Sequence, residues 1–174
     1  LCLAALLLPV RGGWIDPGTD VQDLTTYSYE DGSLYDLVMS DEFDAHGRTF
    51  HDGDDPTWTA TLHSDDSMTS SGLGSQQFYN SSFVSTSNGC LNITTIAELT
   101  TWRGFNPYKK KYEHLSKYFK SAMISSWNKF CFTGGIIEMS AILPGDHDVG
   151  GLWPAFWLLG NLGRATYEAT TNLV

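Results

Sequence analysis

The chain has 174 residues, of which 41% are hydrophobic, and its formal net charge is -10. This length and hydrophobic content predict one globular domain with a substantial core and argue against a disordered chain. The negative charge argues against nucleic acid as a partner, because phosphates would be repelled, and fits a neutral ligand better. Seventeen glycines and 13% aromatic residues favour short strands and turns, so we expect an all-β fold.

The first ten residues are an uninterrupted apolar run. Ten residues are too few to span a bilayer, so we interpret residues 1–10 as the end of a membrane anchor or of a signal segment. Either origin places the rest of the chain in the secretory pathway, and the glycosylation sequons at Asn80 and Asn92 agree with that. Residues 11–34 are rich in Gly, Asp, Thr and Ser without a sustained period and predict a linker. The domain is expected to occupy residues 35–174.

Two cysteines lie inside the expected domain, Cys90 and Cys131. In an oxidising compartment they could pair, closing a loop of about 40 residues and stabilising the fold by about 3–4 kcal/mol. Pairing with a cysteine outside this sequence is an equal alternative. Cys2 belongs to the apolar segment.

Short strands are expected along the domain, with a turn at 87–89 and a long surface loop at 64–74; the strands lie at 37–39, from residue 58, and at 76–79, 83–86, 90–97 and 121–127. Between residues 98 and 119 aromatic residues alternate with a basic run that includes Lys109, Lys110 and Lys111. We interpret that run as a solvated loop, because three lysines in so acidic a chain are a weak nucleic-acid signal. About eight short strands indicate a sandwich or a barrel.

The most strongly patterned stretch runs from Gly134 to Gly163 and predicts two strands joined by a Gly- and Asp-rich loop. In the second strand Trp153 and Trp157 fall on one face, about 13 Å apart, with only Ala155 between them. That spacing suits stacking against sugar rings, while burial of both indoles in the core is the equal alternative. Pro154 predicts an edge or a bulge.

Few residues in the chain suggest catalysis. Glycoside hydrolysis needs two carboxylates, about 5 Å apart for retention and further apart for inversion. Glu42 and Asp44 form the only Glu-x-Asp, and Glu138 has no acidic partner on its strand, so we interpret them as structural or as supporting a site without touching the ligand, with a direct role as the lesser alternative. The run 146–148, Asp-His-Asp between glycines, is interpreted as a solvated turn in preference to a metal site.

At this point the motifs resemble a known family. Residues 134–144 and 151–160 closely resemble the core of glycoside hydrolase family 16, and the matches at 40–43, 77–79 and 121–126 follow in the expected order. Residues 47–50, 53–58, 126–131 and 161–165 look like its β-glucan synthesis-associated branch.

The resemblance implies a concanavalin-like β-jelly-roll sandwich, incomplete at its C-terminus. It also implies that the catalytic glutamates lie in a Glu-x-Asp-x-x-Glu motif beyond Val174, so that this chain carries no catalytic residue and is inactive alone. What carries over is a sugar-binding floor formed by Trp153 and Trp157, with weaker candidates at Tyr79, Trp127, Asn161 and Arg164.

The resemblance further implies a type II membrane protein with a lumenal or extracellular domain that binds and remodels β-1,3/1,6-glucan of the cell wall or of storage. The whole protein would be a retaining glucanase or transglycosylase, or else a non-catalytic glucan-binding scaffold for synthesis. No cofactor is expected; relatives hold a structural calcium, but no loop here is specific enough to assign one.

Overall fold

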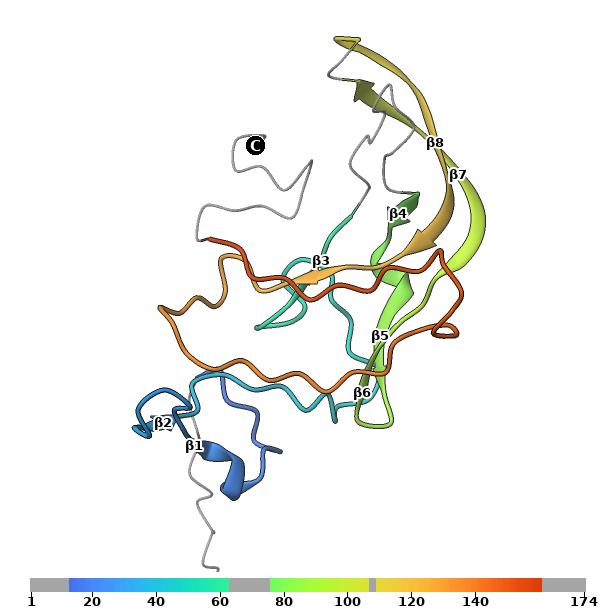
Figure 1. The fold of residues 1–174 in the computed structure, drawn as a ribbon. Coiled ribbons are helices and arrows are strands. Elements are labelled where there is room, and N and C mark those ends of the chain that lie inside the picture. The colour runs from blue at the N-terminus through green and yellow to red at the C-terminus, as the bar shows by residue number, and fades with distance from the viewer. Residues whose placement is uncertain (1–12, 63–75, 107–108, 161–174) are drawn as a thin grey trace, which may run out of the picture.

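A computed structural model of the chain describes residues 13–62, 76–106 and 109–160 (Figure 1). These residues form nine strands and two short 3-10 helices: η1 (Val21–Leu24), β1 (Thr25–Tyr27), β2 (Leu34–Asp36), β3 (Thr59–Ala60), β4 (Gln77–Tyr79), η2 (Ser81–Phe83), β5 (Val84–Ser87), β6 (Cys90–Ile93), β7 (Ile96–Asn106), β8 (Lys111–Ser121) and β9 (Ile124–Ser125). The all-β class is confirmed, and the several sheets are consistent with a jelly-roll-like arrangement. Among these residues no helix is long and apolar enough to cross a membrane. The apolar segment 1–10 and the loop expected at 64–74 lie outside the described residues.

The strands pair into four small sheets. β1 pairs with β2, β3 with β9 and β5 with β6, all antiparallel, while β4, β8 and β7 form a three-stranded sheet in which β4 runs parallel to β8. The β5–β6 turn is the one predicted from the sequence: Asn88 and Gly89 both have positive φ, 54° and 66°. That conformation matches the twist of a two-residue hairpin and favours Asn-Gly.

The sequence predicted no strand between residues 98 and 119, but this region forms a long hairpin. In it β7 pairs with β8 from Ile96↔Lys120 to Asn106↔Lys111, with an irregularity between Ala97 and Thr100. The lysine run, predicted to be a solvated loop, lies in an exposed turn at Lys109 and Lys110 and opens β8 at Lys111. The hairpin curves along one side of the molecule and places this turn at one end (Figure 1).

The segment predicted to be a linker also contains regular structure. Residues 13–36 form η1 and the hairpin β1–β2, whose turn is closed when the Ser28 backbone N–H donates to the Ser33 carbonyl (2.8 Å). Asp31 braces the turn by accepting from the backbone N–H and the hydroxyl of Ser33, at 3.0 and 2.7 Å. Strands of three residues are too short to show a period, which is why the sequence pattern missed them. No strand forms at 37–39, where one was expected, because β2 lies just before it and ends at Asp36. Met39 makes only an isolated bridge to Trp14.

The buried core is small. Phe50, Ala60, Val84 and Ala122 form one cluster, against which four partly buried side chains pack: Trp58, Phe83, Leu91 and Ile124. Phe50 is fully buried, with no exposed surface. The core therefore sits where the loop before β3 meets β5 and the residues between β8 and β9.

The two strands predicted within residues 134–163 are absent from the described part of that range. Residues 134–160 contain no strand, and their side chains, that of Ile136 apart, are exposed. The chain crosses the molecule twice, once in each direction, and the two passes are well separated (Figure 1). A strand requires a hydrogen-bonded neighbour, and alternating hydrophobicity alone does not supply one. The alternation predicted which residues could pair but not whether a partner is present.

Candidate functional site

The expected sugar-binding pair lies in this unpaired stretch. Trp153 is 91% exposed and Trp157 is 65% exposed. Their neighbours Phe156 and Leu158 are also exposed, so exposure does not by itself single out the two indoles. Both tryptophans are therefore accessible to a ligand. Their exposure does not decide between a sugar-binding face and a core face, so that choice still depends on the sequence pattern.

The weaker candidates lie on other elements. Tyr79 is half-buried at the end of β4, where its hydroxyl accepts a hydrogen bond from Gln77 Nε2 at 2.7 Å. Trp127 follows β9 and is exposed, and its backbone N–H donates to Ser125 Oγ at 3.1 Å. Asn161 and Arg164 lie outside the described residues. The structure thus distributes the predicted floor over β4, the segment after β9 and the stretch 152–160.

The densest polar cluster is one that the sequence did not predict as a unit. Arg48 donates to both oxygens of Asp41, from Nη1 at 2.7 Å and from Nη2 at 2.9 Å. It also donates to Asp55 Oδ2, from Nε at 3.0 Å and from Nη2 at 2.7 Å. The Trp58 indole N–H donates to Asp41 Oδ2 at 2.8 Å. We name these four residues and Lys129 the arginine network.

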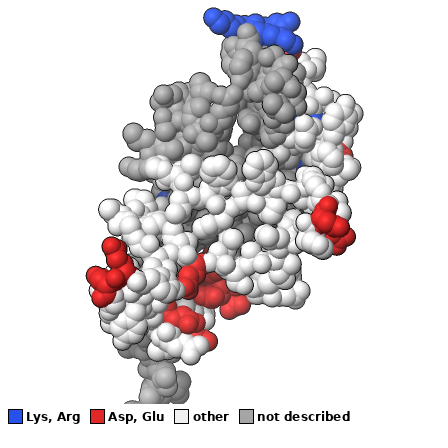
Figure 2. All heavy atoms as spheres, in the orientation of Figure 1, with Lys and Arg blue, Asp and Glu red and all other residues white. Residues whose placement is uncertain are grey.

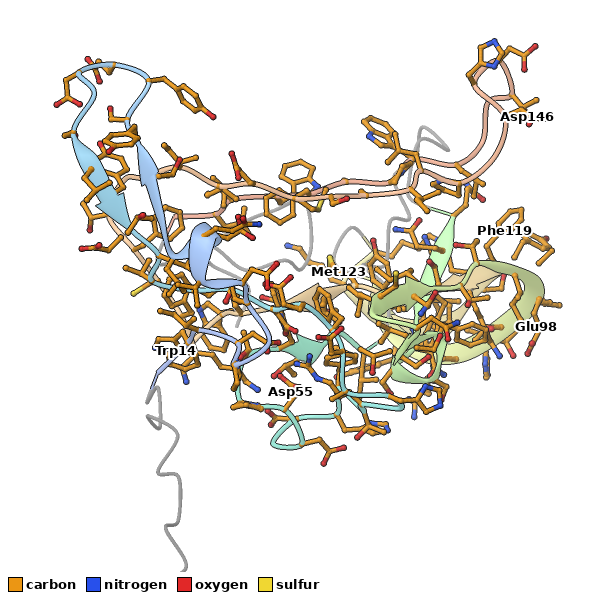
Figure 3. The ribbon with its side chains drawn as sticks, turned by 90° about the horizontal axis from the view of Figure 1, so that it is seen from below. Trp14, Asp55, Glu98, Phe119, Met123 and Asp146 are labelled. Atoms are coloured by element: carbon orange, nitrogen blue, oxygen red, sulfur yellow. The ribbon has the colours of Figure 1, made fainter. Side chains whose placement is uncertain are left out.

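The arginine network also fixes the backbone around it. Asp55 is only 5% exposed, and its Oδ1 accepts from the backbone N–H groups of Thr57 and Trp58 at 2.9 and 2.8 Å. Lys129 Nζ donates to the carbonyls of Asp55 and Trp58, the latter at 2.9 Å. In Figure 3 Asp55 lies amid the loops of the body, whereas Asp146 lies at the outer end of a turn. A five-residue network with this burial holds loops together and presents no free carboxylate for catalysis.

Electrostatics agrees with that structural role. The pKa of Arg48 is raised above its ordinary value, mainly by its hydrogen bonds to Asp41. Burial lowers this pKa, but the bonds to Asp41, together with those to Asp55, outweigh that effect. Burial alone would raise the pKa of Asp55, but hydrogen bonds from Arg48 and from the backbone of Trp58 and Thr57 outweigh it and lower that pKa. Both groups are therefore held in their charged forms. The guanidinium also lies 5.5 Å from the Phe43 ring centroid and 5.3 Å from that of Phe50.

Glu42 has a structural partner, as the sequence suggested. Its Oε1 accepts from the buried Thr19 hydroxyl at 2.7 Å, and Thr19 is also 2.7 Å from Ser40 Oγ. Asp16 Oδ2 accepts from the Glu42 backbone N–H at 3.1 Å. These bonds attach residues 16–19 to the Ser40–Glu42 segment.

The other predicted sites, two glycosylation sequons and two cysteines, all lie within the described residues. Asn92 is exposed and donates through Nδ2 to Ser87 Oγ at 3.0 Å, whereas the half-buried Asn80 caps η2 by accepting from the Ser82 backbone N–H at 2.9 Å. Cys90 and Cys131 are free, exposed thiols. The structure therefore does not contain the disulfide that the sequence allowed, and the pairing stays a prediction.

No metal centre emerges from residues 13–62, 76–106 and 109–160. No group of three or more His, Cys, Asp or Glu residues is placed to hold an ion there. The run 146–148 is exposed, and its turn is closed when the Val149 backbone N–H donates to the Asp146 carbonyl at 3.2 Å, as expected for a solvated turn.

These features together describe an all-β chain that carries exposed aromatic residues, and the densest polar cluster among its described residues has a structural role. The chain belongs to the family described as beta-glucan synthesis-associated protein SKN1/KRE6/Sbg1, whose sequence profile matches residues 3–174. The resemblance to the β-glucan synthesis-associated branch is confirmed.

Individual relatives agree with the family. The chain is 40% identical over 167 residues to the beta-glucan synthesis-associated protein KRE6 of Saccharomyces cerevisiae, covering 95% of this chain and 20% of that protein. It is likewise 40% identical over 167 residues to SKN1 of the same yeast, covering 95% and 19%. A more distant likeness, 31% over 141 residues, covers 74% of this chain and 27% of the endo-1,3-1,4-beta-glycanase ExsH of Rhizobium meliloti. The chain spans about a fifth of the length of the yeast relatives. No solved structure matches it.

Proposed function

We propose that the whole protein binds and remodels β-glucan during β-glucan synthesis, and that this chain contributes part of the sugar-binding surface. The supporting names are those of the yeast relatives, which are called beta-glucan synthesis-associated, and of the bacterial relative, which is called a glycanase. The observation that carries the proposal is the pair of exposed indoles, Trp153 and Trp157, inside the family match. A net charge of -10 suits a neutral polysaccharide.

The mechanism at this surface is stacking. A flat indole covers the apolar face of a sugar ring, and two exposed indoles four residues apart in the chain would contact a glucan chain at separate sugar units. The exposed aromatic rings would be solvated without ligand, so covering them with sugar removes apolar area from water. Binding therefore needs no charged group from this stretch.

The test is Trp157→Ala in the full-length protein, with laminarin as the ligand. Loss of one stacking partner should weaken affinity about five- to tenfold, the equivalent of roughly 1–1.4 kcal/mol. Tyr29→Ala is the matched control, because Tyr29 is also an exposed aromatic residue, at 86% against 65% for Trp157, but lies in the β1–β2 turn. Unchanged affinity together with a lowered melting temperature would mean that Trp157 is a core residue.

Two forms of the activity are open to the whole protein. The catalytic form is a retaining glucanase or transglycosylase that works by double displacement between two glutamates. The other form is a scaffold that binds glucan without cleaving it, and the engagement of Asp41, Asp55 and Glu42 in structural bonds is compatible with it. Release of reducing ends from laminarin by the full-length protein identifies the first form, and its absence, with binding retained, identifies the second.

A location in the secretory pathway is part of the same proposal. It is supported by the apolar run 1–10, which fits a type II membrane anchor, and by the exposure of the Asn92 sequon.

A further inference from the structure

The β7–β8 hairpin carries a charge opposite to that of the rest of the chain. Residues 96–121 contain six Lys or Arg and two Asp or Glu, a formal charge of +4, while the remaining residues contain four and eighteen, a charge of -14. Figure 2 shows the Lys and Arg side chains gathered at one end of the molecule and the Asp and Glu side chains on the rest of that face. On this face positive and negative side chains are therefore separated along the molecule.

The positive charge is concentrated at the hairpin turn. Lys109 and Lys110 form the turn, Lys111 opens β8, and Arg103 on β7 is opposite His114. Glu113 is the one acid nearby in the sequence and neutralises part of the charge: its carboxylate lies 3.2 Å from Lys109 Nζ and 3.9 Å from Lys111 Nζ.

An aromatic ring completes this surface. Tyr112 is exposed, and the Arg103 guanidinium lies 5.3 Å from the centroid of its ring. A cation held over an aromatic face is positioned by the ring without losing its charge. We define the basic tip as Arg103, Lys109, Lys110, Lys111 and Tyr112.

We propose that the basic tip docks onto an anionic phospholipid surface. Lysine is a compact, hydrated charge on a flexible stem, which suits a diffuse layer of headgroups; recognition of defined carboxylates favours the planar fork of arginine. Tyrosine is amphipathic and is enriched where apolar and aqueous phases meet. The tip also lies at an end of the molecule, where it can meet a flat surface (Figure 1).

The acidic remainder of the chain does not prevent this contact. Strands of 11 residues, as β7 and β8 are, reach up to roughly 36 Å from base to tip at about 3.3 Å per residue. Electrostatic interactions decay over about 8 Å at physiological ionic strength. Charges at the base of the hairpin are thus several decay lengths from a surface that the tip touches, so attraction at the tip exceeds repulsion from the body.

The test is co-sedimentation of the full-length protein, shortened to begin at Arg11 so that the apolar run 1–10 cannot insert into lipid, with vesicles of phosphatidylcholine alone or with about 30% phosphatidylserine. The test variant carries Lys109→Gln, Lys110→Gln and Lys111→Gln. A charge-retaining variant replaces the same lysines by Arg. The matched control lowers the net charge equally at the opposite end, through three exposed positions on η1 and β1: Gln22→Glu, Thr25→Glu and Thr26→Glu.

We expect binding to the phosphatidylserine vesicles only, weakened as salt is raised from about 50 to about 300 mM. The glutamine variant should partition about 100- to 150-fold less, because each of the three lysines contributes about fivefold, whereas the arginine variant and the control should bind as the wild type does. Equal binding to both vesicle types, or by the wild type and the glutamine variant, would overturn the proposal. Binding to polyglutamate without binding to vesicles would assign an acidic polypeptide instead and would also overturn it.

Discussion

Removing the carboxylate of Asp55 is the most informative perturbation of the fold. Asp55→Ala deletes both hydrogen bonds from Arg48 to this residue and leaves the backbone N–H groups of Thr57 and Trp58 without their acceptor. It also leaves a guanidinium, 19% exposed, with one carboxylate in place of two.

The expected cost follows from burial. Breaking a buried ion pair by removing one partner costs about 3–5 kcal/mol, because an uncompensated charge remains. Arg48 keeps Asp41 and some contact with water, so the lower part of that range applies, and the lost backbone bonds raise it again by roughly 1 kcal/mol. We expect a loss of about 3–4 kcal/mol, a large fraction of the 5–15 kcal/mol typical of a whole domain.

Urea denaturation of the full-length protein measures this loss, as a lower midpoint at an unchanged slope. The matched control is Asp54→Ala, the neighbouring aspartate, which is exposed and whose side chain accepts a hydrogen bond from Thr49 Oγ1 at 2.7 Å. It should cost less than about 1 kcal/mol. Equal losses of unfolding free energy in Asp55→Ala and Asp54→Ala would refute the assignment of Asp55 as a buried structural anion. A double variant with Arg48→Met should lose less than the sum of the single losses, because both changes remove the same two hydrogen bonds between Arg48 and Asp55.

Two further predictions follow from the same structure. The lowered pKa of Asp55 means that its contribution to stability is complete above its unfolded-state pKa of about 3.9 and is lost as pH falls through the lower folded-state value. Below about pH 4 the free energy of unfolding should therefore fall less steeply with falling pH for Asp55→Ala than for the wild type. Parallel curves would contradict this. If the chain matures in the secretory pathway, Asn92→Gln should reduce the endoglycosidase-sensitive shift in gel mobility more than Asn80→Gln does. The reason is that Asn92 is exposed, whereas Asn80 is half-buried and caps η2. An undiminished shift in Asn92→Gln would be the contrary result.

The sequence predicted the fold class and the local turns well, and the long-range pairings poorly. The β5–β6 turn was predictable because Asn88 and Gly89 impose their conformation locally. The β7–β8 hairpin was not, because the residues that face inward on β8 include Glu113 and the buried Lys117, which break the alternation of apolar and polar residues. A hydrophobic pattern cannot predict that a lysine in a strand is buried.

The arginine network shows a second limit. Residues 40–43, 47–50, 53–58 and 126–131 were each identifiable as motifs of the family, in order along the chain. Nothing in that order shows that Arg48 joins Asp41 to Asp55, or that Lys129 reaches the same loop, since these contacts depend on the positions of the loops in space. For Trp153 and Trp157 the position was predicted and the strand was not, because pairing depends on a neighbour that a local pattern cannot specify.

The arginine network also implies an order of events during folding. Within it the contacts among Asp41, Arg48 and Asp55 join residues 7 positions apart, whereas the bond from Lys129 to the Trp58 carbonyl spans 71. Closing the longer loop costs about 2 kcal/mol more in chain entropy. The local loop can thus be organised early in folding, and Lys129 reaches an acceptor surface that is already shaped. Substitutions at Arg48 should slow folding, and substitutions at Lys129 should mainly speed unfolding.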